Sequence, residues 1–490
     1  MKNTQQIGLI LGPVLFVLIR LFFYPEGLSP EANAVFATTV WMAVWWITEA
    51  VGIEVTALLP IVLFPLTGAL PLAKTTVAYG DKYVFLYMGG FMLAIAIEKW
   101  NLHRRIALNI IRLIGTDINK IILGFMVATG FMSMWISNTA TAVMMLPIAM
   151  AIVKQLEDNP ETLEHENLTF GKALMLAIAY SASIGGVATL IGTPPNLVLA
   201  GVVKETYGIE ISFAEWMLVG LPISVGLLFI TWYYLTKVAF KFQQKGFPGG
   251  KEEINRQLKS LGRISREEIL VLIVFVSMAL AWITRSFVLK KFIPALDDTL
   301  IAMIGAIILF MLPASGKGEK ILDWKNAVKL PWGILLLFGG GLSLAEGFTS
   351  SGLAGWFGSQ MTLLAGVQIL VLLFILVAAV NFLTEVTSNL ATTAMLLPIL
   401  APMALSIDVH PYLLLVPATL AASCAFMLPV ATPPNAVVFG SGYLRIPDMV
   451  RTGVALNVIS IIIVSLLVYF LLPMIWGFEP LPFPAEMGGK

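Results

Sequence analysis

Two stretches of the sequence repeat one pattern: residues 133–147 read SMWISNTATAVMMLP, and residues 384–398 read TEVTSNLATTAMLLP. At a constant offset of 251 residues, seven of the fifteen positions are identical. The identical residues include a polar dipeptide in each copy: Ser137-Asn138 and Ser388-Asn389. The chain therefore contains an internal duplication with a polar step in the middle of each copy.

A second pair of motifs follows downstream of the first. Residues 192–196 read GTPPN and residues 431–435 read ATPPN, at an offset of 239. The 12-residue difference between the two offsets corresponds to a longer polar connector in the first half, within 154–170. Ser, Asn and Pro in a single membrane helix are often only packing or kinking residues. Four such motifs in two matched pairs favour a functional site.

The composition excludes an ordinary soluble protein. Hydrophobic residues make up 58% of the 490 residues and DEKR only 12%, whereas soluble domains carry about 25% charged residues. The net charge of +1 argues against nucleic acid as a partner. One cysteine, Cys424, excludes an internal disulfide and a cysteine-built metal site. We therefore expect a polytopic membrane protein.

Apolar runs of roughly 20 residues predict membrane-spanning helices. The sequence gives eleven: 7–24, 35–51, 54–70, 83–98, 171–203, 213–236, 268–288, 298–313, 331–348, 411–440 and 447–475. Two more apolar stretches, 121–153 and 366–404, are interrupted by the Ser-Asn motifs, and we interpret them as re-entrant hairpins. Two ordinary paired spans remain the alternative for each. The expected fold is an all-α membrane protein.

Lys and Arg accumulate in cytoplasmic loops. If the N-terminus lies inside and each hairpin returns to the face it entered from, 22 of the 30 Lys and Arg residues fall inside. This distribution predicts a multi-pass protein of the plasma (inner) membrane, with a cytoplasmic N-terminus and an external C-terminus. The spans starting at 83 and 331 then begin on opposite sides, so the halves are inverted repeats. Inverted repeats with interrupted helices indicate a secondary transporter with a site near the membrane midplane.

The motifs suit charged ligands of both signs. A helix that starts after Ser-Asn offers free N–H groups and a positive dipole end, which suit a carboxylate. Thr-Pro-Pro-Asn interrupts a helix, because proline removes backbone donors and restricts the preceding residue. The interruption leaves free carbonyls, which suit a small hard cation.

The segments that carry the motifs contain no fixed positive charge. No Lys or Arg occurs in 121–153, 173–203 or 330–444. Burying an anion without a counter-charge is very costly, so we expect cations to enter with the substrate. Na⁺ suits hydroxyl, amide and carbonyl oxygens.

Two acidic residues in apolar segments are weaker candidates, because intramembrane acids are often functional. Glu346 and Glu385 are these residues. Glu385 follows Thr384 and lies beside the second tip, where it could tune a cation site or carry a proton. It could equally be a structural acid with all its hydrogen bonds satisfied.

At these residues the chain resembles the divalent-anion:sodium symporter family, which includes sodium-coupled dicarboxylate and citrate transporters. The resemblance covers nearly the whole chain and rests on the hairpin tips, here Ser137-Asn138-Thr139 and Ser388-Asn389-Leu390. It implies a homodimer, and in each subunit a static scaffold and a transport domain that moves like an elevator. The corresponding parts here are scaffold 1–120, transport 121–240, linker and scaffold 241–364, and transport 365–490.

The resemblance also implies two sodium sites and one substrate site. The first sodium site uses Ser133, Ser137, Asn138 and Gly192; the second uses Thr384, Ser388, Asn389 and Ala431. The substrate carboxylates meet the first tip on one side, and Ser388, Asn389, Leu390, Thr432 and Pro433 on the other. Leu390 departs from the threonine of the family pattern, which removes a hydroxyl and leaves dicarboxylate versus citrate open.

We therefore expect a secondary active symporter that imports C4-dicarboxylates such as succinate, malate or fumarate with Na⁺, in contact with membrane lipid. The alternatives within transport are a tricarboxylate or sulfate carrier and a sodium-independent dicarboxylate exchanger. An intramembrane enzyme needs a nucleophile–base pair or a metal cluster, and the repeated segments contain neither. A channel suits inverted broken-helix repeats less well than alternating access does.

Overall fold

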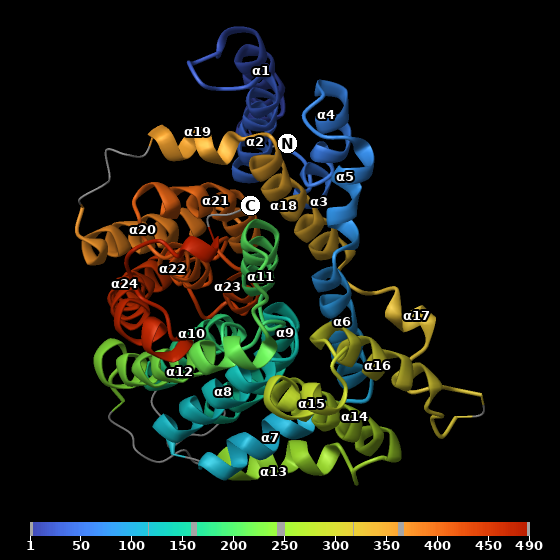
Figure 1. The fold of residues 1–490 in the computed structure, drawn as a ribbon. Helices are drawn as coiled ribbons and strands as arrows, with labels where there is room; N and C mark the ends of the chain where they lie inside the picture. The colour runs from blue at the N-terminus through green and yellow to red at the C-terminus, as the bar shows by residue number, and fades with distance from the viewer. Residues whose placement is uncertain are drawn as a thin grey trace.

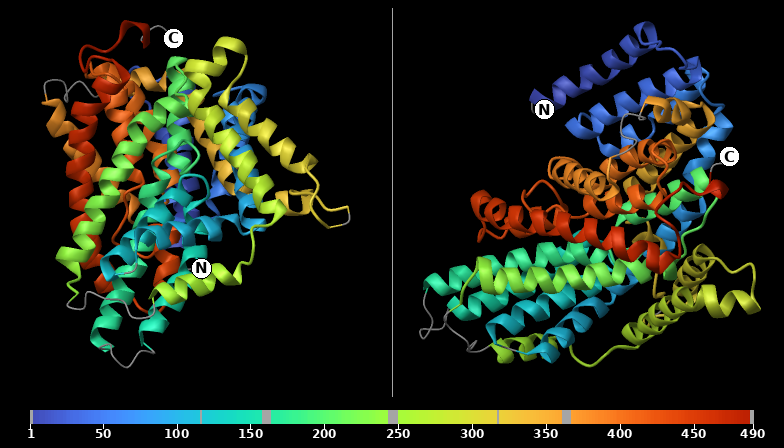
Figure 2. Two further views of the ribbon diagram at one scale, coloured as in Figure 1. Left: turned by 90° about the horizontal axis from the view of Figure 1, so that it is seen from below. Right: turned by 60° about the vertical axis from the view of Figure 1, so that its left-hand side comes forward.

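The computed structural model describes residues 3–115, 117–157, 164–242, 250–316, 318–360 and 367–487. These residues are all-helical and contain no strand, with one isolated bridge between Pro313 and Lys320. Figure 1 shows the order of the helices, and Figure 2 shows that most of the long ones run in roughly the same direction. The prediction of an all-α protein is confirmed.

Nine helices in the described residues are long and apolar enough to cross a membrane. They are Asn3–Phe22, Leu72–Lys99, Asn138–Glu157, Glu164–Gly186, Phe213–Ala239, Arg266–Phe292, Trp332–Ser350, Asn389–Ser406 and Ile446–Trp476. Five shorter apolar helices are Ile53–Thr67, Ile118–Ser133, Asp298–Met311, Ile369–Thr384 and Tyr412–Ala422. The helical segments coincide with the predicted spans, apart from differences at their ends and interruptions within 54–70, 171–203 and 411–440.

The two interrupted apolar stretches are helical hairpins, as the polar steps predict. Helix α8 (Ile118–Ser133) is followed by α9 (Asn138–Glu157), and α20 (Ile369–Thr384) by α21 (Asn389–Ser406). In both hairpins the second helix begins at the asparagine of the Ser-Asn pair. The repeated motif therefore forms the turn of each hairpin.

The two Pro-Pro motifs interrupt helices at matching places. Helix α10 (Glu164–Gly186) stops before the first motif, and α11 (Pro194–Tyr207) begins at its proline. Helix α22 (Tyr412–Ala422) and α23 (Pro433–Phe439) repeat this arrangement. Proline is tolerated in the first helical turn because the N–H it lacks has no helical partner there.

One predicted span differs from the structure. Residues 54–70 form two short helices, α3 (Ile53–Thr56) and α4 (Leu59–Thr67). Pro60 lies in the first turn of α4, where its missing N–H and ring favour a helix start over continuation. Hydropathy alone does not reveal this division, because both pieces are apolar.

The remaining helices complete the chain. They are α1 (Asn3–Phe22), α2 (Pro30–Thr48), α5 (Leu72–Val77), α6 (Lys82–Lys99), α7 (Leu102–Ile114), α12 (Phe213–Tyr233), α13 (Gly250–Ser260), α14 (Arg266–Thr284), α15 (Lys290–Phe292), α16 (Asp298–Met311), α17 (Trp324–Ala327), α18 (Trp332–Ser350), α19 (Leu353–Gln360) and α24 (Ile446–Trp476). A 3-10 turn follows α5 (Ala78–Gly80), and short π-helical segments follow α12 (Tyr234–Ala239) and α14 (Arg285–Leu289). A further 3-10 turn, Ala485–Met487, lies near the C-terminus.

Helix α10 forms the centre of the packed body. It packs against α8, α9, α12 and α23, and every residue from Ala173 to Gly186 is buried. Helices α1 and α2 pack together and stand to one side of this body, at the top of Figure 1. The interruption after α10 therefore lies inside the protein, while the one after α22 is buried as far as Phe426 and becomes exposed at Val430.

Glycines allow the close approach of α10 to α8. A Cβ placed on Gly185 would overlap the backbone carbonyl of Gly130 on α8. No side chain can move to relieve a clash with backbone, so the two helices must separate. This crossing holds the first hairpin against the helix that leads into the first break.

We predict that Gly185→Ala destabilises the folded protein by about 1–3 kcal/mol, the usual range for overpacking a tight core. Thermal unfolding of purified protein in detergent measures this. Gly226→Ala on α12 is the matched control, since nothing lies within 4 Å of its added Cβ. Equal unfolding temperatures for the two variants would contradict this packing.

Candidate functional site

One cavity of about 690 Å³ joins the motifs of both halves. The predicted residues that line it are Ser137, Asn138, Thr139, Gly192, Ser388, Asn389, Leu390, Ala431, Thr432 and Pro433. Two further predicted residues, Ser133 and Thr384, lie behind the asparagines and are fully buried. The fold therefore brings all twelve predicted site residues to one place, from segments about 250 residues apart in sequence.

The remaining wall of the cavity comes from helices outside the repeated motifs. Its residues are Ile47, Thr48, Glu49, Ile53, Tyr87, Phe91 and Ile334. Sequence analysis could not predict this wall, since these residues are mostly apolar and lie in ordinary spans. Among the described residues that line the cavity there is no Lys, Arg or His, which agrees with the absence of basic residues from the motif segments.

The two hairpin tips start helices at the cavity in slightly different ways. Ser137 Oγ accepts a hydrogen bond from Ala140 N at 3.2 Å and so caps α9. Ser388 is the N-cap residue of α21, but its side chain makes no capping hydrogen bond. The positive ends of α9 and α21 therefore both face the cavity, and they attract anions.

Four oxygens gather behind the first tip. Ser133 Oγ lies 2.6 Å from the Ala182 carbonyl oxygen and 2.5 Å from Asn138 Oδ1. The same end of the Asn138 amide lies 3.2 Å from the carbonyl oxygens of Gly192 and Ala182. One serine hydrogen cannot satisfy all of these acceptors. Two arrangements would satisfy these oxygens: the side-chain NH₂ of Asn138 could point toward them and donate, or a cation could bind among them.

The second tip repeats this cluster. Thr384 Oγ1 lies 2.7 Å from Asn389 Oδ1 and 3.0 Å from the Ala422 carbonyl oxygen. Both clusters thus combine a hydroxyl, the side-chain amide of the tip asparagine and a carbonyl from the helix that leads into the break, α10 or α22. Oxygen ligands of this kind suit a hard monovalent or divalent cation. The carbonyls of Ala182 and Ala422 were not foreseen, because backbone ligands leave no mark on the sequence.

The asparagine that ends each Pro-Pro motif donates hydrogen bonds to backbone carbonyls of the loop before it. Asn196 Nδ2 donates to the carbonyls of Thr189 (2.7 Å), Val187 (3.2 Å) and Gly186 (3.3 Å). In the second half, Asn435 Nδ2 donates to the carbonyl of Leu428 at 3.0 Å. The expectation of free carbonyls in the first break is therefore wrong for these three, whose oxygens a side-chain amide binds.

Glycine is required at one point of the first break. A Cβ on Gly192 would overlap the backbone carbonyl of Gly186. This contact brings the end of the break back against the end of α10. It places the Gly192 carbonyl beside the Asn138 amide.

Glu385 is a structural acid that holds the second break in place. Its carboxylate accepts hydrogen bonds from three successive backbone N–H groups, Phe426 (2.8 Å), Met427 (3.0 Å) and Leu428 (3.0 Å). Asn457 Nδ2 donates a fourth at 2.8 Å. Of the two roles left open by the sequence, the geometry favours the satisfied acid over a proton carrier.

Glu346 lies outside the cavity lining. Its carboxylate pairs with Lys74 at 2.5 Å and accepts a hydrogen bond from Ser350. This acid thus has a structural partner, and a functional role for Glu346 stays a prediction.

Comparisons with known proteins agree with this site. The family model described as "Sodium:sulfate symporter transmembrane region" matches residues 3–477. The sodium-dependent dicarboxylate transporter SdcS of Staphylococcus saprophyticus is 48% identical over 487 residues, covering 98% of this chain and 94% of that protein. The protein of the same name from Staphylococcus aureus (strain bovine RF122 / ET3-1) is 50% identical over the same length, with the same coverage.

Two solved structures share the fold at low sequence identity. MtrF of Neisseria gonorrhoeae, from a class of antimetabolite efflux pumps, superposes with a TM-score of 0.60 at 12% identity and covers 98% of this chain and 97% of its own. The YdaH transporter of Alcanivorax borkumensis gives a TM-score of 0.56 at 14% identity and covers 82% and 87%. These likenesses show that the fold is that of membrane transporters.

The match along nearly the whole chain, relatives that are about half identical and the many apolar helices lead to one conclusion. The chain is a multi-pass membrane protein and belongs to the sodium:sulfate symporter family, the divalent-anion:sodium symporters that its two Ser-Asn tips resemble.

Proposed function

We propose that this protein is a secondary active symporter that couples Na⁺ influx to the uptake of C4-dicarboxylates such as succinate, malate and fumarate. The observation that carries the proposal is a cavity with two helix starts and two oxygen clusters but no basic residue among the described residues that line it. The relatives named sodium-dependent dicarboxylate transporters support both the ion and the substrate class. A transporter, rather than an enzyme, follows from the same relatives.

Two sodium ions occupy the oxygen clusters in this proposal. The first ion is held by Ser133, Ser137, Asn138 and Gly192, and the second by Thr384, Ser388, Asn389 and Ala431. The Ser133 hydroxyl and the carbonyl oxygens of Gly192 and Ala182 gather at one end of the Asn138 amide, which supports a cation site there once that amide presents its oxygen to the ion. The carbonyls of Ala182 and Ala422 are additional ligands in reach of the same hydroxyls.

The dicarboxylate lies between the two tips. One carboxylate meets Ser137, Asn138 and Thr139 at the start of α9, and the other meets Ser388, Asn389, Thr432 and Pro433. Leu390 is buried at the second tip. Its methyl groups cannot bind an additional substrate oxygen, whereas the hydroxyl of a threonine at this position could. This difference favours dicarboxylates over citrate or sulfate. A sodium-independent exchanger needs basic residues in the cavity, and none of the described lining residues is basic.

Transport requires the cavity to reach both sides of the membrane. We propose an elevator-type alternating-access mechanism in which 121–240 and 365–490 move against a scaffold of 1–120 and 241–364. The hairpins are re-entrant, the halves are inverted repeats, and the protein is a homodimer in the plasma (inner) membrane. With the N-terminus cytoplasmic and the C-terminus external, the scaffold residues Thr48 and Ile334 lie near the inner side, so the cavity opens toward the cytoplasm.

We predict that succinate uptake into proteoliposomes requires a sodium gradient, because the cavity lining, in the part of the chain that the structure describes, supplies no positive side chain. Radiolabelled succinate uptake in sodium and in choline buffers measures this, with citrate and sulfate as competitors. Equal uptake in the two buffers would remove the symport mechanism and favour exchange or proton coupling.

The transported species should be the dianion, since two bound cations are matched by two carboxylates. At constant sodium, uptake of succinate is expected to fall as the pH drops through the second pKa of succinate. An increase over that range would mean that the monoanion is preferred.

Asn138→Asp and Asn389→Asp each add a negative charge beside the dianion. The repulsion is roughly 4 kcal/mol at 4 Å for an effective dielectric near 20, which predicts a loss of succinate affinity on the order of 10²- to 10³-fold. Leu390→Thr is the matched control at a tip. It should have a mild effect and alter the preference between succinate and citrate.

Binding of succinate to purified, folded protein separates this role from helix packing. If the asparagines only hold helices together, the Asp variants lose thermal stability but keep their affinity. Wild-type affinity in folded variants at both positions would contradict the assignment of the site.

A further inference from the structure

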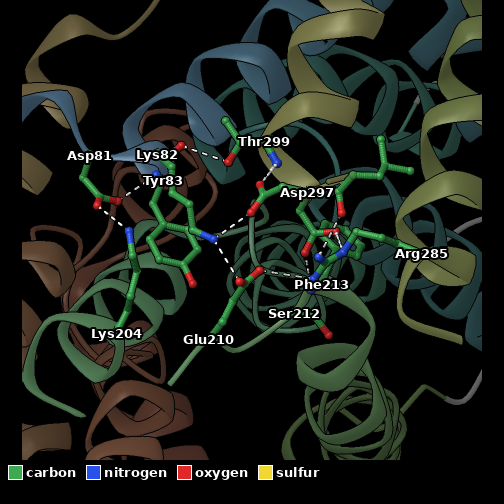
Figure 3. A network of polar contacts seen from close by, with 12 residues as sticks. Asp81, Lys82, Tyr83, Lys204, Glu210, Ser212, Phe213, Arg285, Asp297 and Thr299 are labelled. Atoms are coloured by element: carbon green, nitrogen blue, oxygen red, sulfur yellow. Dashed lines mark hydrogen bonds and ion pairs between the residues drawn. The ribbon is translucent and has the colours of Figure 1, made fainter. Parts of the chain in front are cut away.

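A network of ion pairs lies at the end of α11 that is remote from the cavity. Figure 3 shows side chains from the end of α11, the segment before α12, the start of α6 and the region around α16 converging on one another. The charged members are Asp81, Lys82, Lys204, Glu210, Arg285, Asp297 and Asp298. We call this set the clasp.

Three pairs of the clasp join the proposed moving part to the proposed scaffold. Lys204 Nζ lies 2.8 Å from Asp81 Oδ2. Glu210 reaches two scaffold cations, Lys82 Nζ at 3.0 Å and Arg285 Nη2 at 3.3 Å. The connection between α11 and α12 is therefore tied to α6 and to the end of α14.

The same two cations also have partners within the scaffold. Lys82 Nζ lies 2.7 Å from Asp297 Oδ2, and Arg285 Nε lies 2.7 Å from Asp298 Oδ1. Removing the charge of Glu210 therefore leaves neither cation unpaired. The ion pairs of Glu210 therefore stabilise the position of the transport part relative to the scaffold, and they are not needed for the folding of either part.

Burial makes these pairs stronger than ordinary surface pairs. The side chain of Arg285 is only 5% exposed and that of Lys82 is 27% exposed, while that of Glu210 is 38% exposed, so the two pairs of Glu210 are shielded from their cationic side. Exposed ion pairs contribute little because water and salt screen them, while shielded pairs are screened less. The clasp thus contributes measurably to the free energy of the state in which it forms.

Helix α11 connects the cavity to the clasp. It begins at Pro194, which lines the cavity, and it carries Lys204 ten residues later, about 15 Å along the helix at 1.5 Å per residue. Between these points α11 packs on α18, where Gly201 lies against Leu342 and Phe338. The open cavity lies at one end of α11. At the other end, the ion pairs of the clasp hold the α11–α12 connection against α6 and α14.

We propose that Glu210 is a positioning residue of the transport cycle. Its pairs with Lys82 and Arg285, together with the Lys204–Asp81 pair, hold the transport domain in one position. In that position the cavity opens beside Thr48, at the C-terminal end of α2. This inference rests on the proposed two-part mechanism. These pairs must separate before the tips reach the opposite face. Since a contact made in one state only shifts the equilibrium toward that state, the clasp favours the state seen here.

A cysteine in the cavity wall reports the position of the transport domain. Val430 lines the cavity and is 77% exposed, and the native Cys424 is buried and shielded from water-soluble reagents. Val430→Cys is therefore labelled by a membrane-impermeant maleimide from the face to which the cavity opens. Right-side-out and inside-out membrane vesicles present each face in turn.

In the Val430→Cys background, Glu210→Gln should speed labelling from the face opposite the cavity by about 3- to 10-fold, the range expected for losing two partly shielded pairs, and should slow labelling from the cavity face by a smaller factor, because the cavity-facing state is the major one. Lys204→Gln should act in the same direction. Asp297→Asn is the matched control: it removes a pair within the scaffold and keeps the capping of Thr299 N, which Asn provides as well as Asp does. It should leave both labelling rates within about twofold.

Sodium with succinate should protect the cysteine in the background protein, because the residue faces the same cavity. Absence of that protection would contradict the proposed function, and with it this inference. Intact protection combined with equal labelling of Glu210→Gln and Asp297→Asn on both faces would overturn the clasp alone. A merely structural role for Glu210 predicts lower thermal stability without any change in which face is labelled.

Discussion

Charge neutralisation without basic side chains is the constraint on which the rest of this structure depends. A dianion in a low-dielectric cavity needs positive charge, and the described lining of the cavity provides no Lys, Arg or His. The compensation comes from helix starts and from oxygen clusters that hold cations. Coupling between sodium and substrate then follows from electrostatics: each ion lowers the cost of binding the other, and the linkage is reciprocal.

This constraint explains why the helices are broken where they are. A hydroxyl, an amide and a backbone carbonyl meet behind each tip only because the helix that leads into the break, α10 or α22, ends at that level, near Ala182 in one half and Ala422 in the other. Irregular backbone inside a membrane protein must be satisfied internally. The two halves share one side chain for this purpose and differ in a second. Asn196 and Asn435 hold both breaks, and Glu385 adds a carboxylate to the second.

The sequence predicted the hairpins, the breaks and the residues of the candidate site because duplication made them visible. A Ser-Asn pair that recurs at a fixed offset stands out, as does Pro-Pro in an apolar segment. Backbone ligands such as the Ala182 carbonyl could not be predicted, since any residue supplies a carbonyl. The scaffold wall with Tyr87 and Phe91 was missed for a similar reason, as buried aromatics are common in every span. The clasp was also missed: Lys204 and Glu210 look like ordinary loop charges until the fold places them against α6.

The dependence of succinate affinity on sodium tests the central claim most directly. Succinate binding to purified protein, measured by calorimetry over a range of sodium concentrations at constant ionic strength, gives the number of ions linked to each substrate. With two oxygen clusters filled on binding, the logarithm of the association constant should rise with the logarithm of sodium concentration, with a slope approaching about two below saturation. A slope of zero, with succinate bound equally well in choline, would contradict the account.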